Sequence, residues 1–148
     1  MRNVKKLIFF TSLLLLLTSC ASTKQYVKFA GAQSNSETKA QIYVLRPSSF
    51  GSAIKMNIYQ DDKIIGKLGP NSYLSWDVDA SIGEFRIISV AENSDILTIK
   101  PVAGKTYYIK QKVKLGVVIA RTELELIGKI EAEEMLRRLK KPKSNYAE

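Results

Sequence analysis

The sequence contains no histidine and only one cysteine, Cys20. Without histidine the chain lacks the commonest general base and the commonest zinc ligand, and it cannot form Ser-His or Cys-His nucleophile pairs. A single cysteine excludes a disulfide within the chain, so a folded domain must rely on its apolar core. Hydrophobic residues make up 45% of the 148 residues, which is enough for such a core. We therefore expect one folded domain with short additional segments, and no metal or other cofactor.

Acidic residues are outnumbered by basic ones. The chain has 23 Lys and Arg residues against 14 Asp and Glu residues, a formal net charge of +9. Three of these positive charges, Arg2, Lys5 and Lys6, lie ahead of Cys20 with no acidic neighbour. The surplus on the rest of the chain would attract anionic lipid head groups, acidic polymers or acidic proteins. Nucleic acid is not expected as a partner, because the amino-terminal segment predicts export.

That segment has the order of a secretory signal. A short positive region, Met1–Lys6, precedes an apolar run, Leu7–Leu17, which is interrupted only by Thr11 and Ser12. The run is shorter than the ~20 residues that a membrane-spanning helix needs. Small residues follow it, as they do at a signal cleavage site. We expect residues 1–19 to be removed and the remainder to be exported.

The residues at the expected cleavage site, Leu17-Thr18-Ser19-Cys20, resemble the bacterial lipobox. The resemblance implies a diacylglycerol thioether on Cys20, cleavage before it, and acylation of the new amino group. Two or three acyl chains hold a protein stably at a membrane, whereas one chain holds it only marginally. Ala21 follows the cysteine, where Asp would favour retention in the inner membrane. The resemblance thus implies a lipid-anchored envelope protein, placed on the outer membrane facing the periplasm if the source has two membranes.

Alternating apolar and polar residues begin at Ala40 and continue to Gly128, with turn residues roughly every ten positions. No helical period interrupts this pattern, which is typical of an all-β, antiparallel β-sandwich over residues 40–128. Asp61-Asp62 predicts a tight hairpin. Two further hairpins of one sheet system are expected around Gly83 and Gly104. The expected strands are 42–45, 54–59, 63–68, 73–78, 85–90, 97–99, 106–114 and 117–126.

The segments flanking the sandwich differ in character. Residues 20–39 are rich in polar and small residues and predict a flexible tether, within which Tyr26, Val27 and Phe29 could dock locally. Residues 129–148 predict a helix over 129–141, stopped by Pro142 and followed by a loose tail. Its apolar stripe either packs on the sandwich or binds a partner or a membrane. The stripe consists of Ala132, Met135, Leu136 and Leu139.

Several of these pieces together resemble a family of bacterial lipoproteins known as domain of unknown function 2846. The residues that carry the resemblance are Ile42–Pro47, Asp61–Gly66, Asn71–Tyr73, Ala103–Gln111, Gly116 and Ala120-Arg121. The sequence departs from the family pattern at Asp62, where Gly is common, and at Thr122, where Pro often follows the Arg. The resemblance implies a transthyretin- or immunoglobulin-like sandwich on a lipid anchor. It implies no activity, so Cys20 is the one functional residue carried over.

A row of basic residues follows one face of the expected strand 106–114. Lys110, Lys112 and Lys114 alternate with core-facing residues, and the next strand would place Arg121, Glu123 and Glu125 on the same outer face. One interpretation is a solvated, salt-bridged face that also discourages edge-to-edge aggregation. The other is a basic binding face, formed by Lys110, Lys112, Lys114 and Arg121, for anionic lipid or cell-wall polymer.

No set of residues converges on a catalytic pattern, so a non-enzymatic binding or structural module is the leading hypothesis. Its expected partners are the membrane through the lipid, and envelope proteins or peptidoglycan. The alternative is an envelope hydrolase or carbohydrate-active enzyme using Asp or Glu. That enzyme would need two carboxylates facing each other across a concave site, roughly 5–10 Å apart. Asp61-Asp62, Asp77 and Asp79 are explained by turn and surface roles, and Trp76 is expected in the core.

Overall fold

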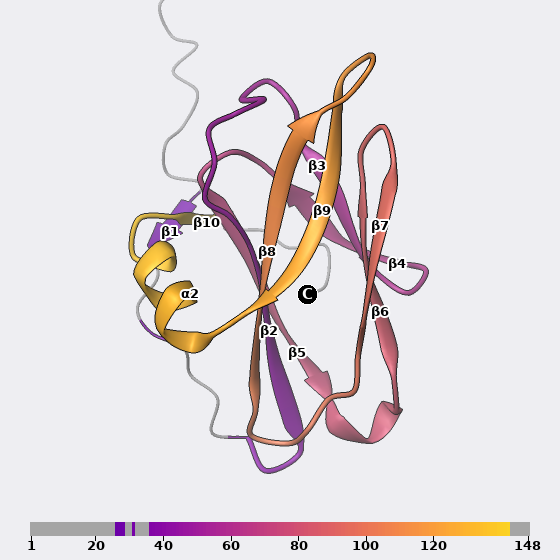
Figure 1. Cartoon of the computed structure of the whole chain (residues 1–148). Coiled ribbons are helices and arrows are strands. Elements are labelled where there is room, and N and C mark those ends of the chain that lie inside the picture. The colour runs from indigo at the N-terminus through magenta and orange to yellow at the C-terminus, as the bar shows by residue number, and fades with distance from the viewer. Residues whose placement is uncertain (1–25, 29–30, 32–35, 143–148) are drawn as a thin grey trace, which may run out of the picture.

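In the computed structural model, two β-sheets pack face to face and a short helix lies on the outer side of the larger sheet (Figure 1). The structure describes residues 26–28, 31 and 36–142. Cys20 and the expected signal lie outside these residues. The predicted β-sandwich with one short carboxy-terminal helix is confirmed within the described part of the chain.

The larger sheet has the strand order β1-β10-β5-β2-β8-β9, and the smaller sheet has the order β4-β3-β6-β7. Most neighbouring pairs are antiparallel, whereas β2 with β8 and β10 with β5 are parallel. The larger sheet contains β1 (Tyr26–Lys28), β2 (Lys39–Arg46), β5 (Ser72–Asp79), β8 (Thr106–Leu115), β9 (Ala120–Ile127) and β10 (Lys140–Pro142). The smaller sheet contains β3 (Met56–Gln60), β4 (Lys63–Leu68), β6 (Phe85–Val90) and β7 (Ser94–Ile99).

The connections between strands show which expected hairpins form. Asp61-Asp62 joins β3 to β4 as a two-residue hairpin, and Asp61 has a φ of 49° there. The hairpins expected around Gly83 and Gly104 are wrong, because β5 to β6 and β7 to β8 each pass from one sheet to the other. These links are longer than a tight hairpin, and the first contains a turn of 3₁₀ helix, Ala80–Ile82. The extra length lets the chain cross the roughly 10 Å between stacked sheets.

The core lies between the two sheets, and a second apolar cluster lies on the outer side of the larger one. Ile42 and Val44 of β2 face inward, while Tyr43 and Leu45 of the same strand face the helix. A strand covered on both faces explains why this stretch is apolar almost without interruption. The inner cluster also includes Ile58, Leu74, Phe85, Ile87 and Ile109, and the outer one Tyr73, Tyr108, Ala132, Leu136 and Leu139.

Helix α2 (Lys129–Leu136) packs its apolar stripe on the sheet, which is one of the two alternatives the sequence left open. It is shorter than expected, since the chain leaves the helix after Leu136 and forms β10 at residue 140. The Lys140 amide donates to the Asn71 carbonyl at 3.2 Å, so pairing with the sheet replaces further helical bonds. Pro142 is therefore the last residue of a strand and not the stop of a helix.

The segment expected as a tether contains strand β1, which pairs antiparallel with β10 at the edge of the larger sheet. Tyr26 and Val27 belong to this strand, whereas Phe29, the third residue expected to dock, lies outside the described residues. The first sandwich strand of the expected domain, β2, then begins at Lys39. No helix in the described part of the chain is both long and apolar enough to cross a membrane.

Candidate functional site

The outer face of the β8–β9 hairpin carries the basic residues that the sequence singled out. The two strands share the outer face that was expected, although the turn is longer than Leu115-Gly116: Lys110 lies opposite Glu125, Lys112 opposite Glu123, and Lys114 opposite Arg121. The inward side chains of the same strand, Ile109 and Gln111, are buried in the sandwich. Alternation along β8 thus separates a charged outer row from a core-facing row.

Ion pairs neutralise most of this outer row. The Lys112 ammonium lies 2.8 Å from Glu125 Oε2 and 3.3 Å from Glu123 Oε1. Lys114 also pairs with Glu123, and the Lys110 Nζ lies 3.1 Å from Glu131 Oε1 on α2. Hydrogen bonds from Lys114 and Lys112 lower the pKa of the Glu123 carboxyl.

One end of the row keeps an excess of positive charge. Lys114 and Arg121 face each other directly, and like charges at opposed positions repel. Both are exposed and both flank the turn between β8 and β9. The positive charge that remains on the outer face of the hairpin is therefore concentrated next to its turn.

The turn itself presents apolar side chains to solvent. We call Leu115, Val117, Val118 and Ile119 the apolar tip; their exposed fractions are 80%, 92%, 86% and 57%. The expected strand 117–126 begins only at Ala120, so the prediction for residues 117–119 is wrong. β-Branched residues favour strands, but here their backbone amides bind a side chain instead of a neighbouring strand.

That side chain is Glu92, which lies between β6 and β7. Its carboxylate accepts hydrogen bonds from the amides of Val117, Val118 and Ile119 at 3.0, 3.0 and 3.2 Å. These bonds lower the pKa of the Glu92 carboxyl. The carboxylate approaches so closely that a Cβ at position 116 would overlap it, which explains Gly116. The apolar tip is thus fixed to the body of the sandwich.

Arg46 organises the neighbouring loop from inside the sandwich. Its guanidinium is fully buried and donates to the carbonyls of Ile54, Phe50 and Gly51 at 2.7, 2.8 and 2.9 Å. Burial lowers the pKa of this group. Sequence reasoning missed this role, although Arg46 continues the inward series of Ile42 and Val44, which could have indicated it.

A second buried polar group lies between the sheets. The Gln111 Nε2 donates to the hydroxyls of Ser89 at 2.6 Å and Thr122 at 3.2 Å, and these two hydroxyls lie 2.7 Å apart. Asn93 holds the Thr122 backbone through both of its side-chain atoms. These hydrogen bonds bring β6, β8 and β9 together, while the buried Gln111 Oε1 has no hydrogen-bond partner among the described residues.

We call the end of the sandwich where β2, β4, β6 and β8 finish the tip end. Besides the apolar tip it holds a shallow groove of about 570 Å³, lined on its charged side by Lys55, Arg138 and Lys140. Ser52 and Asn71 are among its polar lining residues. Positive charge at this groove and beside the apolar tip gives the tip end a cationic character.

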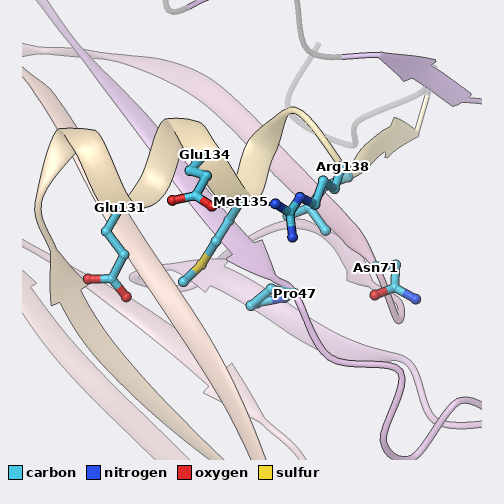
Figure 2. A pocket seen from close by; sticks show the side chains of 7 residues that line it. Pro47, Asn71, Glu131, Glu134, Met135 and Arg138 are labelled. Atoms are coloured by element: carbon cyan, nitrogen blue, oxygen red, sulfur yellow. Dashed lines mark hydrogen bonds and ion pairs between the residues drawn. The ribbon is translucent and has the colours of Figure 1, made fainter.

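Another groove, of about 330 Å³, separates α2 from the end of β2 (Figure 2). Its carboxylates, Glu131 and Glu134, both project from α2, while Pro47 and Asn71 form the facing wall. Glu134 pairs with Arg138 at 3.4 Å. Within this lining, the two carboxylates therefore do not face each other across the groove.

The acidic residues of the turns have structural partners. Asp61 accepts from the Arg86 amide at 3.0 Å, and Asp79 caps the 3₁₀ turn by accepting from the Ser81 amide at 2.9 Å. Trp76 is half-buried against the core and donates to Gln60 at 2.7 Å. Among the described residues, no three His, Cys, Asp or Glu side chains are grouped as metal ligands.

Comparison with known proteins gives one informative relative. No family model matches the chain, and no solved structure matches it. An uncharacterized protein of Haemophilus influenzae is 32% identical over 136 residues, which cover 84% of this chain and 77% of that protein. The chain belongs to the same protein family as this Haemophilus influenzae protein.

Proposed function

We propose that the chain is a lipoprotein of the cell envelope, in which a non-enzymatic binding or structural module is held at a membrane by acyl chains on Cys20. The observation that carries the proposal is the order of the first twenty residues: a positive start, an apolar run of limited length, and Leu17-Thr18-Ser19-Cys20. The resemblance of Ile42–Pro47 and Ala103–Gln111 to a lipoprotein family supports it.

The position of β1 fits such an anchor. Tyr26, the first residue of β1, follows Cys20 by six positions, and β1 is paired into the sheet. An extended chain covers at most about 3.6 Å per residue, so six residues reach roughly 20 Å. A lipid on Cys20 would hold the folded domain directly at the membrane surface. If the source has two membranes, Ala21 favours the outer one, with the domain in the periplasm.

Replacement of Cys20 tests the anchor. In Cys20→Ser the sulfur that would carry the diacylglycerol is lost, so we expect the protein to leave the membrane fraction or to remain as an uncut precursor. Ser22→Ala is the matched control and should stay lipidated. Intact-mass measurement of the purified wild type should show a cleaved chain with acyl groups; a bare terminus or an uncut leader would refute the anchor.

We propose envelope proteins or peptidoglycan as the partners of the module, and the β8–β9 outer face as a candidate contact. Lys114 and Arg121 support this because they lie opposite each other beside the turn, although Lys114 also pairs with Glu123. Crosslinking in intact cells should recover a partner, and Lys110→Glu with Lys112→Glu and Lys114→Glu should abolish its recovery. Lys63→Glu with Lys100→Glu, at exposed positions away from this face, is the control. Equal recovery from both variants would count against the contact.

A further inference from the structure

The apolar tip is exposed yet rigid, which is unusual for a solvent-facing turn. Four large apolar side chains point outward from a turn whose backbone is fixed by Glu92. Hydration of this surface is unfavourable, so such a group of side chains commonly marks a contact with another apolar phase. Backbone amides without partners are costly in lipid, and here the three amides at positions 117–119 are already bonded.

The strand register places the start of the folded domain at the same end of the sandwich. β1 pairs with β10 through Lys28 and Lys140, and Lys140 lies beside Ser72. Ser72 is opposite Arg46, the last residue of β2, and β2 runs parallel to β8. Strand β1, the first described element after the apolar amino-terminal segment, is therefore paired into the sheet beside the tip end, with Lys28 as its nearest residue.

Charge is distributed unevenly between the two ends. Exposed basic residues gather at the tip end, in the groove and beside the apolar tip: Lys55, Lys114, Arg121, Arg138 and Lys140. At the opposite end, where β3 and β5 finish and β6 begins, charges of both signs are mixed: the acidic turn residues Asp61, Asp62, Asp79 and Glu84 lie there with the exposed basic residues Lys39, Lys63, Arg86, Lys100 and Lys105. The basic residues grouped around the groove and the apolar tip are therefore the part of the domain that would attract an anionic surface.

We propose that the tip end seats on an anionic lipid bilayer, with the apolar tip entering the boundary between head groups and acyl chains. Lys55, Arg138 and Lys140 then face lipid phosphates. The proposal rests on the proposed function, since the anchor at Cys20 brings the domain to the membrane. It adds an orientation: the domain is held by two contacts, the lipid and its own turn, and the end that carries the Asp61-Asp62 hairpin faces away from the bilayer.

The bilayer accounts for this combination better than a second protein. The apolar residues form the end of a protruding hairpin instead of a broad face, and a protrusion enters a fluid interface without needing a matching pocket. The cationic groove matches the phosphates that would surround an inserted turn. Strand β1, which follows the expected anchor along the chain, is paired beside this end.

A thiol introduced at the apolar tip tests the proposal, because lipidation would convert Cys20 into a thioether and leave no other thiol. The lipidated full chain carrying Val118→Cys is labelled with a polarity-sensitive fluorophore and reconstituted in vesicles of phosphatidylethanolamine and phosphatidylglycerol. Val102→Cys, at an exposed apolar position between β7 and β8 at the opposite end, is the matched control. We expect the emission at position 118 to shift to the blue and to be quenched by lipids brominated on their acyl chains, and the emission at 102 to show neither effect.

Each outcome separates the insertion from the anchor. Equal, unquenched emission at positions 118 and 102 on a lipidated chain would overturn the insertion and leave the anchor intact. A blue shift at 118 without quenching by brominated lipid would mean that protein covers the tip, which also overturns it. Unchanged quenching after phosphatidylcholine replaces phosphatidylglycerol would overturn the role of the cationic groove. Labelling of the wild type at Cys20 would instead refute the anchor itself. Unchanged unfolding midpoints would show that both variants fold.

Discussion

Replacement of Arg46 by Met should destabilise the sandwich by removing the group that holds the loop 47–55. The guanidinium makes three short hydrogen bonds to backbone carbonyls, between 2.7 and 2.9 Å. Hydrogen bonds to a charged group each contribute about 1.5–3 kcal/mol, and an unpaired buried carbonyl is costly. The cost of burying the charge offsets part of this gain. We expect a net loss of about 3 kcal/mol in the free energy of unfolding, or roughly 10 °C in Tm for a domain of this size.

Denaturant unfolding followed by the fluorescence of Trp76, the one tryptophan, would measure this loss. Arg86→Met is the matched control, because Arg86 forms an exposed ion pair with Asp61 at 3.4 Å and such pairs contribute little. Arg46→Lys should also be destabilised, since one ammonium cannot reproduce the planar fork. If Arg46→Met unfolds at the same denaturant concentration as Arg86→Met, the hydrogen bonds of Arg46 are not a significant source of stability and the reasoning fails.

Three further predictions concern the helix, the tip and alkaline stability. Leu136→Ala should lower the free energy of unfolding by about 2–5 kcal/mol because its side chain is fully buried under α2, whereas Ile130→Ala, on the exposed side, should have little effect in the same denaturation assay. Gly116→Ala should displace the Glu92 carboxylate and speed amide hydrogen exchange at positions 117–119, while Gly128→Ala, where a Cβ meets nothing, should not. Burial, assisted by the charge of Glu133, raises the pKa of Tyr108 to about 12 from an ordinary value of 10.0. The unfolded chain therefore loses this proton first, so stability should be constant below pH 10 and fall as the pH rises toward about 12; Tyr108→Phe should flatten that fall in pH-dependent denaturation, and an unaltered profile would contradict it.

Local patterns predicted the sandwich well where side chains alternate strictly. The shared outer face of β8 and β9 followed from one row of core residues and one row of charges, since a slip by one residue would bury Lys112 and expose Gln111. The apolar stripe of α2 could be predicted equally well from the spacing of its residues. These elements could be predicted because each residue's environment is set by its position in a repeating backbone.

The features that escaped prediction depend on partners distant in sequence. Residues 137–141 continue a helical pattern, but α2 ends at Leu136, and pairing with β5 and β1 draws residues 140–142 into β10. The links from β5 to β6 and from β7 to β8 cross between the sheets. The strands on either side of each link nevertheless show the same alternation of apolar residues as the strands of a hairpin. The tip at 117–119 reads as a strand, and nothing local reveals that Glu92 binds its amides. The role of Arg46 could be predicted only by placing an arginine side chain inside the core.

The pairing of β1 with β10 couples the two ends of the chain. When β1 is paired with β10, six residues link Cys20 to the sheet, and they reach about 20 Å. Without β10, β1 loses this partner, the first residue held in the sheet is Lys39, and nineteen residues extend to about 65 Å. On a chain anchored at Cys20, a protease or a fusion that displaced residues 140–142 would lengthen the segment between Cys20 and the first residue held in the sheet. On such a chain, the distance between the domain and the bilayer would therefore depend on carboxy-terminal residues that lie far from Cys20 in the sequence.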